Sequence, residues 1–240
     1  MALRIGCDLD GVLADMEGAL AREAEQLFGA RPAGGSGRRH PPEADAAPVE
    51  GADNAPLQHE LQLSDRERRA LWRHVRSIEG FWETLEETEA GVVSKLARLV
   101  EERRWEIMFL TRRPNTSGDT AQVQSQRWLQ AKGFALPSVY VVTASRGLIA
   151  AGLTLDIVID DTPENCLDVA SDSKALTIAI FRSTDVAPPP VLKSMGIHVV
   201  PTTSDCLDLL VEIDAGLKHA EPGALGRVMR TLGLKQQANA

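Results

Sequence analysis

Acidic and hydroxyl side chains follow short apolar runs at three widely separated points of the chain. The segment Asp8–Gly11 ends the first run, Thr111 ends the second, and the pair Asp160 and Asp161 ends the third. In an open parallel sheet, ligands bind in the crevice beyond the carboxyl ends of the strands. We therefore expect these distant side chains to lie around one crevice.

Asp8 and Asp10 stand two residues apart on a turn that leaves the first apolar run. Such a pair can point both carboxylates into one pocket, where one attacks an electrophile and the other transfers a proton. Gly11 lets the backbone turn sharply and approach a ligand. The alternative is an ordinary turn, which uses Asp and Gly for their conformational tolerance.

The adjacent carboxylates of Asp160 and Asp161 repel each other unless a cation lies between them. Mg²⁺ suits this pair because it prefers a few carboxylates together with water and phosphate oxygens. Asp161 could also cap the helix that Pro163 begins, and the two roles are compatible. Thr111 either offers its hydroxyl and neighbouring N–H groups to phosphate oxygens or is an ordinary turn residue.

Short apolar segments alternate with helical ones, which predicts an α/β fold with a Rossmann-like parallel sheet and helices on both faces. The predicted strands are Leu3–Leu9, Glu106–Leu110, Val139–Thr143, Asp156–Asp160, Leu176–Phe181 and Ile197–Val200. The predicted helices among the later strands are Thr120–Lys132, Arg146–Ala151, Pro163–Ser171 and Asp205–Asp214.

The stretch between the first two strands has helical periodicity and almost no strand pattern, so we expect an inserted α-helical cap. Ser64 and Glu67 form a capping box that opens a helix to about Glu79. The predicted divisions are a core of residues 1–12 and 105–220, a cap of residues 13–104, and a C-terminal tail of residues 221–240 with a weak helix at Leu225–Leu234. Residues 30–57 are rich in Pro, Gly, Ala and Ser, which predicts a flexible insertion within the cap.

Composition narrows the class of protein. The formal net charge of −8 disfavours a nucleic-acid polymer as partner, but a bound cation would still admit a small anionic substrate. The three cysteines contain no CxxC pair, so neither a disulfide framework nor a zinc site is expected. Because the sequence has no signal-peptide pattern and no apolar window near the length of about 18 residues that a membrane helix needs, we expect a cytoplasmic protein without a membrane partner.

In their order along the chain, these segments resemble the motifs of the haloacid dehalogenase-like hydrolase superfamily, in its phosphatase branch. Its first motif, DxDG[TV] after an apolar strand, matches Ile5–Val12, its second matches Ile107–Thr111, and its fourth matches Ile157–Asp161. The third motif usually supplies a lysine. Arg146 is the best match here and Lys132 a weaker one, although Arg and Lys are not interchangeable in binding phosphate.

The resemblance implies a phosphomonoester hydrolase that uses Mg²⁺. Asp8 would attack phosphorus and form an acyl phosphate, while Asp10 would protonate the leaving oxygen and then activate water. Mg²⁺ would be held by Asp8, by the backbone carbonyl of Asp10, and by Asp160 or Asp161. The second aspartate favours phosphate over carbon–halogen chemistry, because an alkoxide leaving group needs a proton.

The same resemblance implies that Thr111 and Arg146 bind the phosphoryl oxygens. We further expect Arg112 and Arg113 to form an exposed basic pair, which either contacts a second anionic group of the substrate or stays solvated.

A weaker resemblance, to the 5'(3')-deoxyribonucleotidases, lies in Asp8–Asp15 and Gly80–Leu85. There an aromatic side chain helps to form the base pocket, so Phe81 or Trp82 would stack on a nucleobase. The alternative is that both rings pack the cap against the core.

The expected substrate is thus a small phosphorylated metabolite, such as a nucleoside monophosphate. The alternatives are a catalytically silent binding or regulatory module of the same fold and a phosphotransferase. The sequence leaves the exact substrate and the oligomeric state open.

Overall fold

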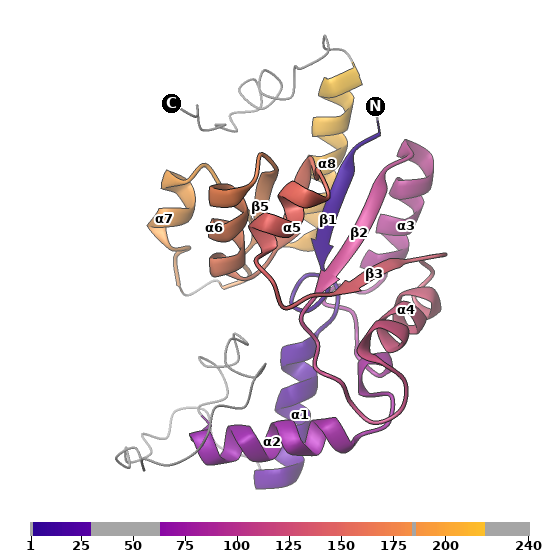
Figure 1. Ribbon diagram of the computed structural model, residues 1–240, viewed down its shortest axis with the longest axis vertical. Coiled ribbons are helices and arrows are strands. Elements are labelled where there is room, and N and C mark those ends of the chain that lie inside the picture. Colours follow the sequence, from indigo (N-terminus) through magenta and orange to yellow (C-terminus); the bar gives the residue numbers. More distant parts are fainter. Residues whose placement is uncertain (1, 30–62, 184–185, 219–240) are drawn as a thin grey trace.

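The computed structural model describes residues 2–29, 63–183 and 186–218 and contains one parallel sheet of six strands (Figure 1). The strand order is β3-β2-β1-β4-β5-β6. The strands are β1 (Arg4–Asp8), β2 (Glu106–Thr111), β3 (Ser138–Val141), β4 (Ile157–Asp160), β5 (Leu176–Ile180) and β6 (His198–Val200). Each of the predicted strands is present, and the predicted α/β, Rossmann-like fold class is confirmed.

The helices before β2 are α1 (Met16–Phe28), α2 (Asp65–Ser77), the 3₁₀ helix η2 (Phe81–Glu83) and α3 (Val92–Arg103). The later ones are α4 (Ala121–Ala131), α5 (Arg146–Gly152), α6 (Pro163–Asp172), α7 (Pro190–Ser194) and α8 (Thr203–Lys218). The predicted capping box starts α2, since the Glu67 N–H donates to Ser64 Oγ and the Ser64 N–H donates to the Glu67 carboxylate. Over the described parts of the chain, no helix has both the length and the apolar character needed to cross a membrane.

Helices cover both faces of the sheet, and successive strand residues alternate between these faces. On one face, Ile107, Phe109, Ile157 and Ile159 share a core with residues of α3, α4 and α8. On the other, Met108, Leu110 and Val158 pack with Ala150 of α5 and Val169 of α6. Asp160 stands two residues after Val158, so the same alternation directs its side chain toward the α5 face.

The helices between β1 and β2 occupy two different places. α1 and α2 contact each other beyond the carboxyl ends of the strands, whereas α3 lies alongside the sheet and contacts α8 (Figure 1). The predicted division between cap and core stays a prediction. The predicted insertion at residues 30–57 and the predicted tail at residues 221–240 lie outside the described residues.

Candidate active site

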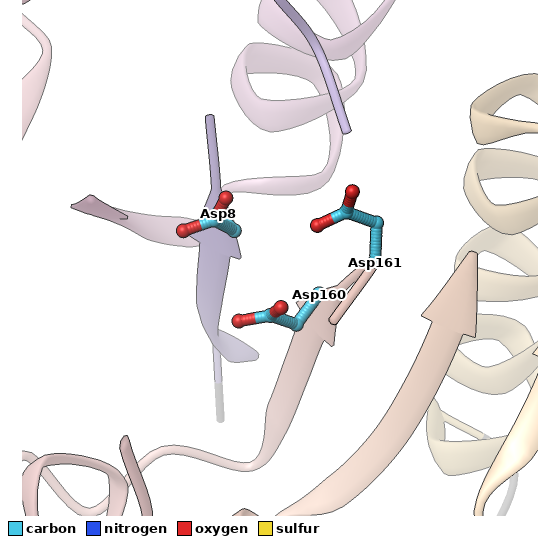
Figure 2. Close-up of side chains that lie close together, drawn as sticks. All are labelled: Asp8, Asp160 and Asp161. Atoms are coloured by element: carbon cyan, nitrogen blue, oxygen red, sulfur yellow. The ribbon is translucent and has the colours of Figure 1, made fainter. Parts of the chain in front are cut away.

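Three carboxylates meet where β1 and β4 end. Asp8 is the last residue of β1, Asp160 is the last residue of β4, and Asp161 follows it. One carboxylate oxygen from each residue lies within 4.8 Å of the others, and Figure 2 shows the three side chains facing a shared space. Hard oxygen donors in this number suit Mg²⁺. These residues therefore fit the metal that the sequence predicted.

Arg146, the first residue of α5, lies against two of these carboxylates. Its Nη2 donates to Asp8 Oδ1 at 2.7 Å, and its Nε lies 3.6 Å from Asp160 Oδ2. With every group ionised, three carboxylates and one guanidinium leave two negative charges, which a divalent cation would neutralise.

Burial opposes the ionisation of this cluster. Burial and the neighbouring Asp160 carboxylate raise the pKa of Asp8 well above its ordinary value, and the same two causes raise the pKa of Asp161. Burial also raises the pKa of Asp160, against the opposing effect of Arg146. The fold thus holds carboxylates together at a cost that a bound cation would offset.

The guanidinium of Arg146 also has N–H donors that are not used in hydrogen bonds. Among the described residues, its Nε and Nη1 atoms are buried without a hydrogen-bond partner. An unsatisfied buried donor costs about 1–3 kcal/mol, so this guanidinium is suited to an additional anion. Lys132, the weaker candidate for this role, instead lies 3.9 Å from the carboxylate of Glu86. The structure therefore places Arg146, and not Lys132, beside Asp8.

The start of α5 is held against α6, which positions Arg146. Ser145 caps α5 by accepting from the Leu148 N–H at 3.1 Å. Asp168 of α6 accepts from the Ser145 hydroxyl at 2.7 Å and from the Gly147 N–H at 3.1 Å. A Cβ at Gly147 would lie 2.3 Å from the Asp168 carbonyl oxygen, so only glycine permits this approach. No local sequence pattern predicted this role of Asp168.

Asp160 is oriented by hydrogen bonds from the start of α6. The Thr162 N–H donates to its Oδ1 at 2.9 Å, and the Asn165 side chain donates to both carboxylate oxygens at 3.1 Å. These bonds explain how one acidic residue of the pair is kept in place while buried. Asn165 was also missed, although its position in the first turn after Thr162-Pro163 was a possible signal.

Asp161 packs directly against the turn that follows Asp10. Gly11 has φ +74°, and a Cβ there would lie 1.8 Å from Asp161 Oδ2. Both the backbone conformation and the lack of a side chain are therefore required at this position.

Replacing Gly11 by Ala should push the Asp161 carboxylate out of the cluster and strain the turn. We expect the apparent affinity for Mg²⁺, measured by isothermal titration calorimetry, to fall at least about 10-fold, since ligand orientation typically affects metal affinity by this much. The matched control is Gly152→Ala, because a Cβ at Gly152 meets open space. Unchanged Mg²⁺ affinity in Gly11→Ala would show that Asp161 does not contribute to the site.

Asp10 is paired with Arg113, which corrects the expectation of an exposed Arg112–Arg113 pair. Arg112 is exposed, but the side chain of Arg113 is 0% exposed. Its Nε lies 3.0 Å from both carboxylate oxygens of Asp10, and its Nη2 donates to Oδ1 at 2.7 Å. Thr111 donates its hydroxyl to Asp10 Oδ2 at 3.2 Å. Burial of Arg113 is tolerated because a carboxylate neutralises it.

Phe81 and Trp82 pack inside the protein. Their side chains are buried, and the two rings meet edge to face at 5.0 Å. The indole N–H of Trp82 donates to the Pro114 carbonyl, and its ring lies 4.9 Å from the Arg113 guanidinium carbon. Neither ring presents a face to a substrate in this arrangement, so the expected stacking on a nucleobase is not supported. The contacts favour the alternative that the rings pack against the core.

Arg182, two residues after the end of β5, is a further residue whose role was not predicted from the sequence. Its guanidinium donates to the Gly11 carbonyl and, at 2.7 Å, to the Thr203 hydroxyl. Glu89 accepts from the Thr203 N–H at 2.6 Å and joins the same network. These contacts tie the Gly11 turn to the start of α8. Its position just after an apolar strand, like that of the predicted site residues, was a signal that could have found it.

No protein-family model and no curated protein sequence matches the chain. Among solved structures, a candidate beta-phosphoglucomutase from Thermotoga maritima matches with a TM-score of 0.50 and 18% identity, over 88% of this chain and 99% of that one. A hydrolase from Pseudomonas syringae matches with a TM-score of 0.50 and 16% identity, over 89% and 99% of the two chains. A HAD family hydrolase from Deinococcus radiodurans R1, with bound phosphate and sodium, matches with a TM-score of 0.50 and 14% identity, over 99% of each chain. The chain therefore has the fold of the haloacid dehalogenase-like (HAD) hydrolases, as the order of its motifs predicted.

Proposed function

We propose that the protein is a Mg²⁺-dependent phosphomonoester hydrolase that acts on a small phosphorylated metabolite through an aspartyl-phosphate on Asp8. The observation that carries this proposal is the convergence of Asp8, Asp160 and Asp161 beside Arg146, whose buried guanidinium has donors without partners. The carboxylates can bind a cation, and the unpaired N–H donors of Arg146 can bind an anion.

In the proposed first step, an oxygen of Asp8 forms a bond to phosphorus while the bond to the leaving oxygen breaks. Asp10 gives its proton to that leaving oxygen, so the substrate alcohol departs neutral. Arg146 and Thr111 bind the phosphoryl oxygens and hold phosphorus in line with Asp8. The Thr111 hydroxyl donates to Asp10 Oδ2 in the structure, so it would turn away from this carboxylate to donate to a phosphoryl oxygen.

In the second step, Asp10 takes a proton from a water molecule, which attacks phosphorus of the acyl phosphate. Inorganic phosphate leaves, and Asp8 is restored as a carboxylate. Mg²⁺ held by Asp8, the Asp10 carbonyl, and Asp160 or Asp161 would supply the charge neutralisation that phosphoryl transfer needs. The side chain of Arg146 keeps the Asp8 carboxylate oriented through its 2.7 Å bond.

The proposal is tested by a screen of phosphorylated metabolites, with release of inorganic phosphate as the readout and Mg²⁺ in the buffer. Nucleoside monophosphates belong in the screen as one class among several, because the buried Phe81 and Trp82 give no support to nucleobase stacking. We expect release from at least one phosphomonoester and none from the same preparation of Asp8→Asn.

Two other outcomes would contradict hydrolysis. Loss of substrate without free phosphate, with the phosphoryl group recovered on an added alcohol or sugar acceptor, would identify a phosphotransferase. No turnover of any phosphomonoester, with or without an acceptor, would favour the catalytically silent binding or regulatory module.

A further inference from the structure

Arg113 is enclosed on every side by groups that suit a guanidinium. Besides its bidentate contact with Asp10, its Nη1 donates to Ser125 Oγ of α4 at 2.9 Å. Its guanidinium carbon lies 4.9 Å from the centre of the Trp82 ring and 5.9 Å from that of Trp128. Aromatic faces at these distances attract a cation. The Arg113 side chain is 0% exposed, and both its Nη1 and Nη2 atoms are hydrogen-bonded, so it has little freedom to move.

The partners of Arg113 are themselves fixed. Ser125 donates its hydroxyl to the Ala121 carbonyl at 2.6 Å, and the Trp82 indole donates to the Pro114 carbonyl at 2.9 Å. The backbone N–H of Trp82 also donates to the side-chain oxygen of Gln124 on α4. The rigid body that holds Arg113 therefore comprises α4 and η2, and not only the turn that carries Asp10.

Asp10 itself lies on a turn and is 13% exposed in its side chain. Its described side-chain partners are Arg113 and Thr111. If Thr111 turns its hydroxyl to a phosphoryl oxygen, as proposed above, Asp10 keeps only Arg113 among these partners. The orientation of Asp10 during the reaction would then depend on the bidentate pair, which fixes a carboxylate in plane as well as in place.

We propose that Arg113 is a positioning residue, which aims the Asp10 carboxyl at the leaving oxygen and so supports proton transfer. This inference rests on the proposed function, in which Asp10 is the acid and base. It predicts that a substitution of Arg113 slows the cleavage of an ester whose leaving group needs a proton more than that of an ester whose leaving group does not. An alkoxide leaving group needs the proton from Asp10, whereas 4-nitrophenolate departs without one.

The test compares kcat/KM of Arg113→Met on glycerol 2-phosphate and on 4-nitrophenyl phosphate, because kcat/KM reports formation of the acyl phosphate and not its hydrolysis, which is common to both esters. We expect kcat/KM to fall about 100-fold on the alkyl ester and less than about 5-fold on the aryl ester, since general acid catalysis contributes about 10²–10⁴-fold. Arg113→Lys should show the same selective loss, because an ammonium cannot bridge both oxygens of Asp10 and reach Ser125 as well.

The matched control is Arg127→Met, which removes an arginine from α4 whose contacts are exposed ion pairs with Asp119 and Glu83. It should leave the ratio of kcat/KM for the alkyl ester to kcat/KM for the aryl ester unchanged. A double-mutant cycle with Asp10→Asn separates the roles further, because Arg113→Met should not alter the ratio once Asp10 cannot transfer a proton.

An equal fall of kcat/KM on both esters would overturn the inference and leave Arg113 a purely structural residue. If Arg113 variants do not fold, as judged by circular dichroism, Ser125→Ala loosens the arginine and should give a smaller selective loss. An unchanged ratio in folded Ser125→Ala would then also overturn it. Failure of the proposed function gives a different result, since the wild-type protein would then release phosphate from no phosphomonoester of the screen.

Discussion

Replacing Asp8 by Asn should abolish turnover, with kcat lower by at least about 10⁴-fold, the scale seen when a catalytic nucleophile is removed. An amide is a poor nucleophile and cannot form the acyl phosphate, while its size and shape match those of the carboxylate. The measurement is phosphate release from the best substrate of the screen under saturating Mg²⁺. Retained activity in Asp8→Asn would refute the assignment of the nucleophile.

The same variant should keep its fold, which distinguishes a chemical from a structural loss. Burial and the Asp160 carboxylate raise the pKa of Asp8, which means that the folded state disfavours its charge. Replacement by a neutral amide removes that repulsion, although it also removes the ion pair with Arg146. We expect the metal-free variant to unfold at the same temperature as the metal-free wild type or higher. A clearly lower unfolding temperature would show that the ion pair outweighs the repulsion.

Removal of the metal should have the second largest effect. Excess chelator should lower phosphate release at least about 100-fold, because phosphoryl transfer depends chiefly on charge neutralisation and positioning. Addition of Mg²⁺ beyond the chelator should restore the rate. The control is the same concentration of chelator already saturated with Mg²⁺, which should have no effect. Unchanged rates in excess free chelator would remove the metal from the mechanism.

The acidic cluster also predicts how stability depends on pH. The pKa values of Asp8, Asp160 and Asp161 are raised in the folded state, so between the ordinary carboxyl pKa and the raised values the folded protein binds more protons than the unfolded chain. The free energy of unfolding of the metal-free protein should therefore fall as pH rises through that window. Mg²⁺ binds the deprotonated carboxylates, so the stabilisation by Mg²⁺ should grow as pH rises.

This dependence is measured by thermal unfolding at a series of pH values from about 4 upward, with and without Mg²⁺. Asp161→Asn is the informative comparison, since it removes one of the three carboxyl groups whose pKa is raised. Its metal-free stability should fall less with pH than that of the wild type. An equal slope in both proteins would show that Asp161 does not titrate with the cluster.

The sequence by itself determined the succession of the six strands along the chain, most of the helices between them, and the polar residues at the ends of β1, β2 and β4. It could do so because period-two and helical patterns of apolar residues are local properties, and because parallel strands must bring their carboxyl ends to one edge of the sheet. Asp8, Asp160 and Asp161 were predicted to converge for that reason, and they do. The capping box at Ser64 could likewise be predicted, because it depends only on residues within one helical turn.

Only the tertiary structure decided which arginine became part of the site. Arg112 and Arg113 are adjacent and chemically identical, but one is exposed and the other is enclosed by Asp10, Ser125 and two tryptophans. Burial of a charge depends on partners brought from distant segments, which no local pattern specifies. The same holds for Asp168 and Arg182, whose roles come from α5 packing on α6 and from the Gly11 turn meeting the start of α8.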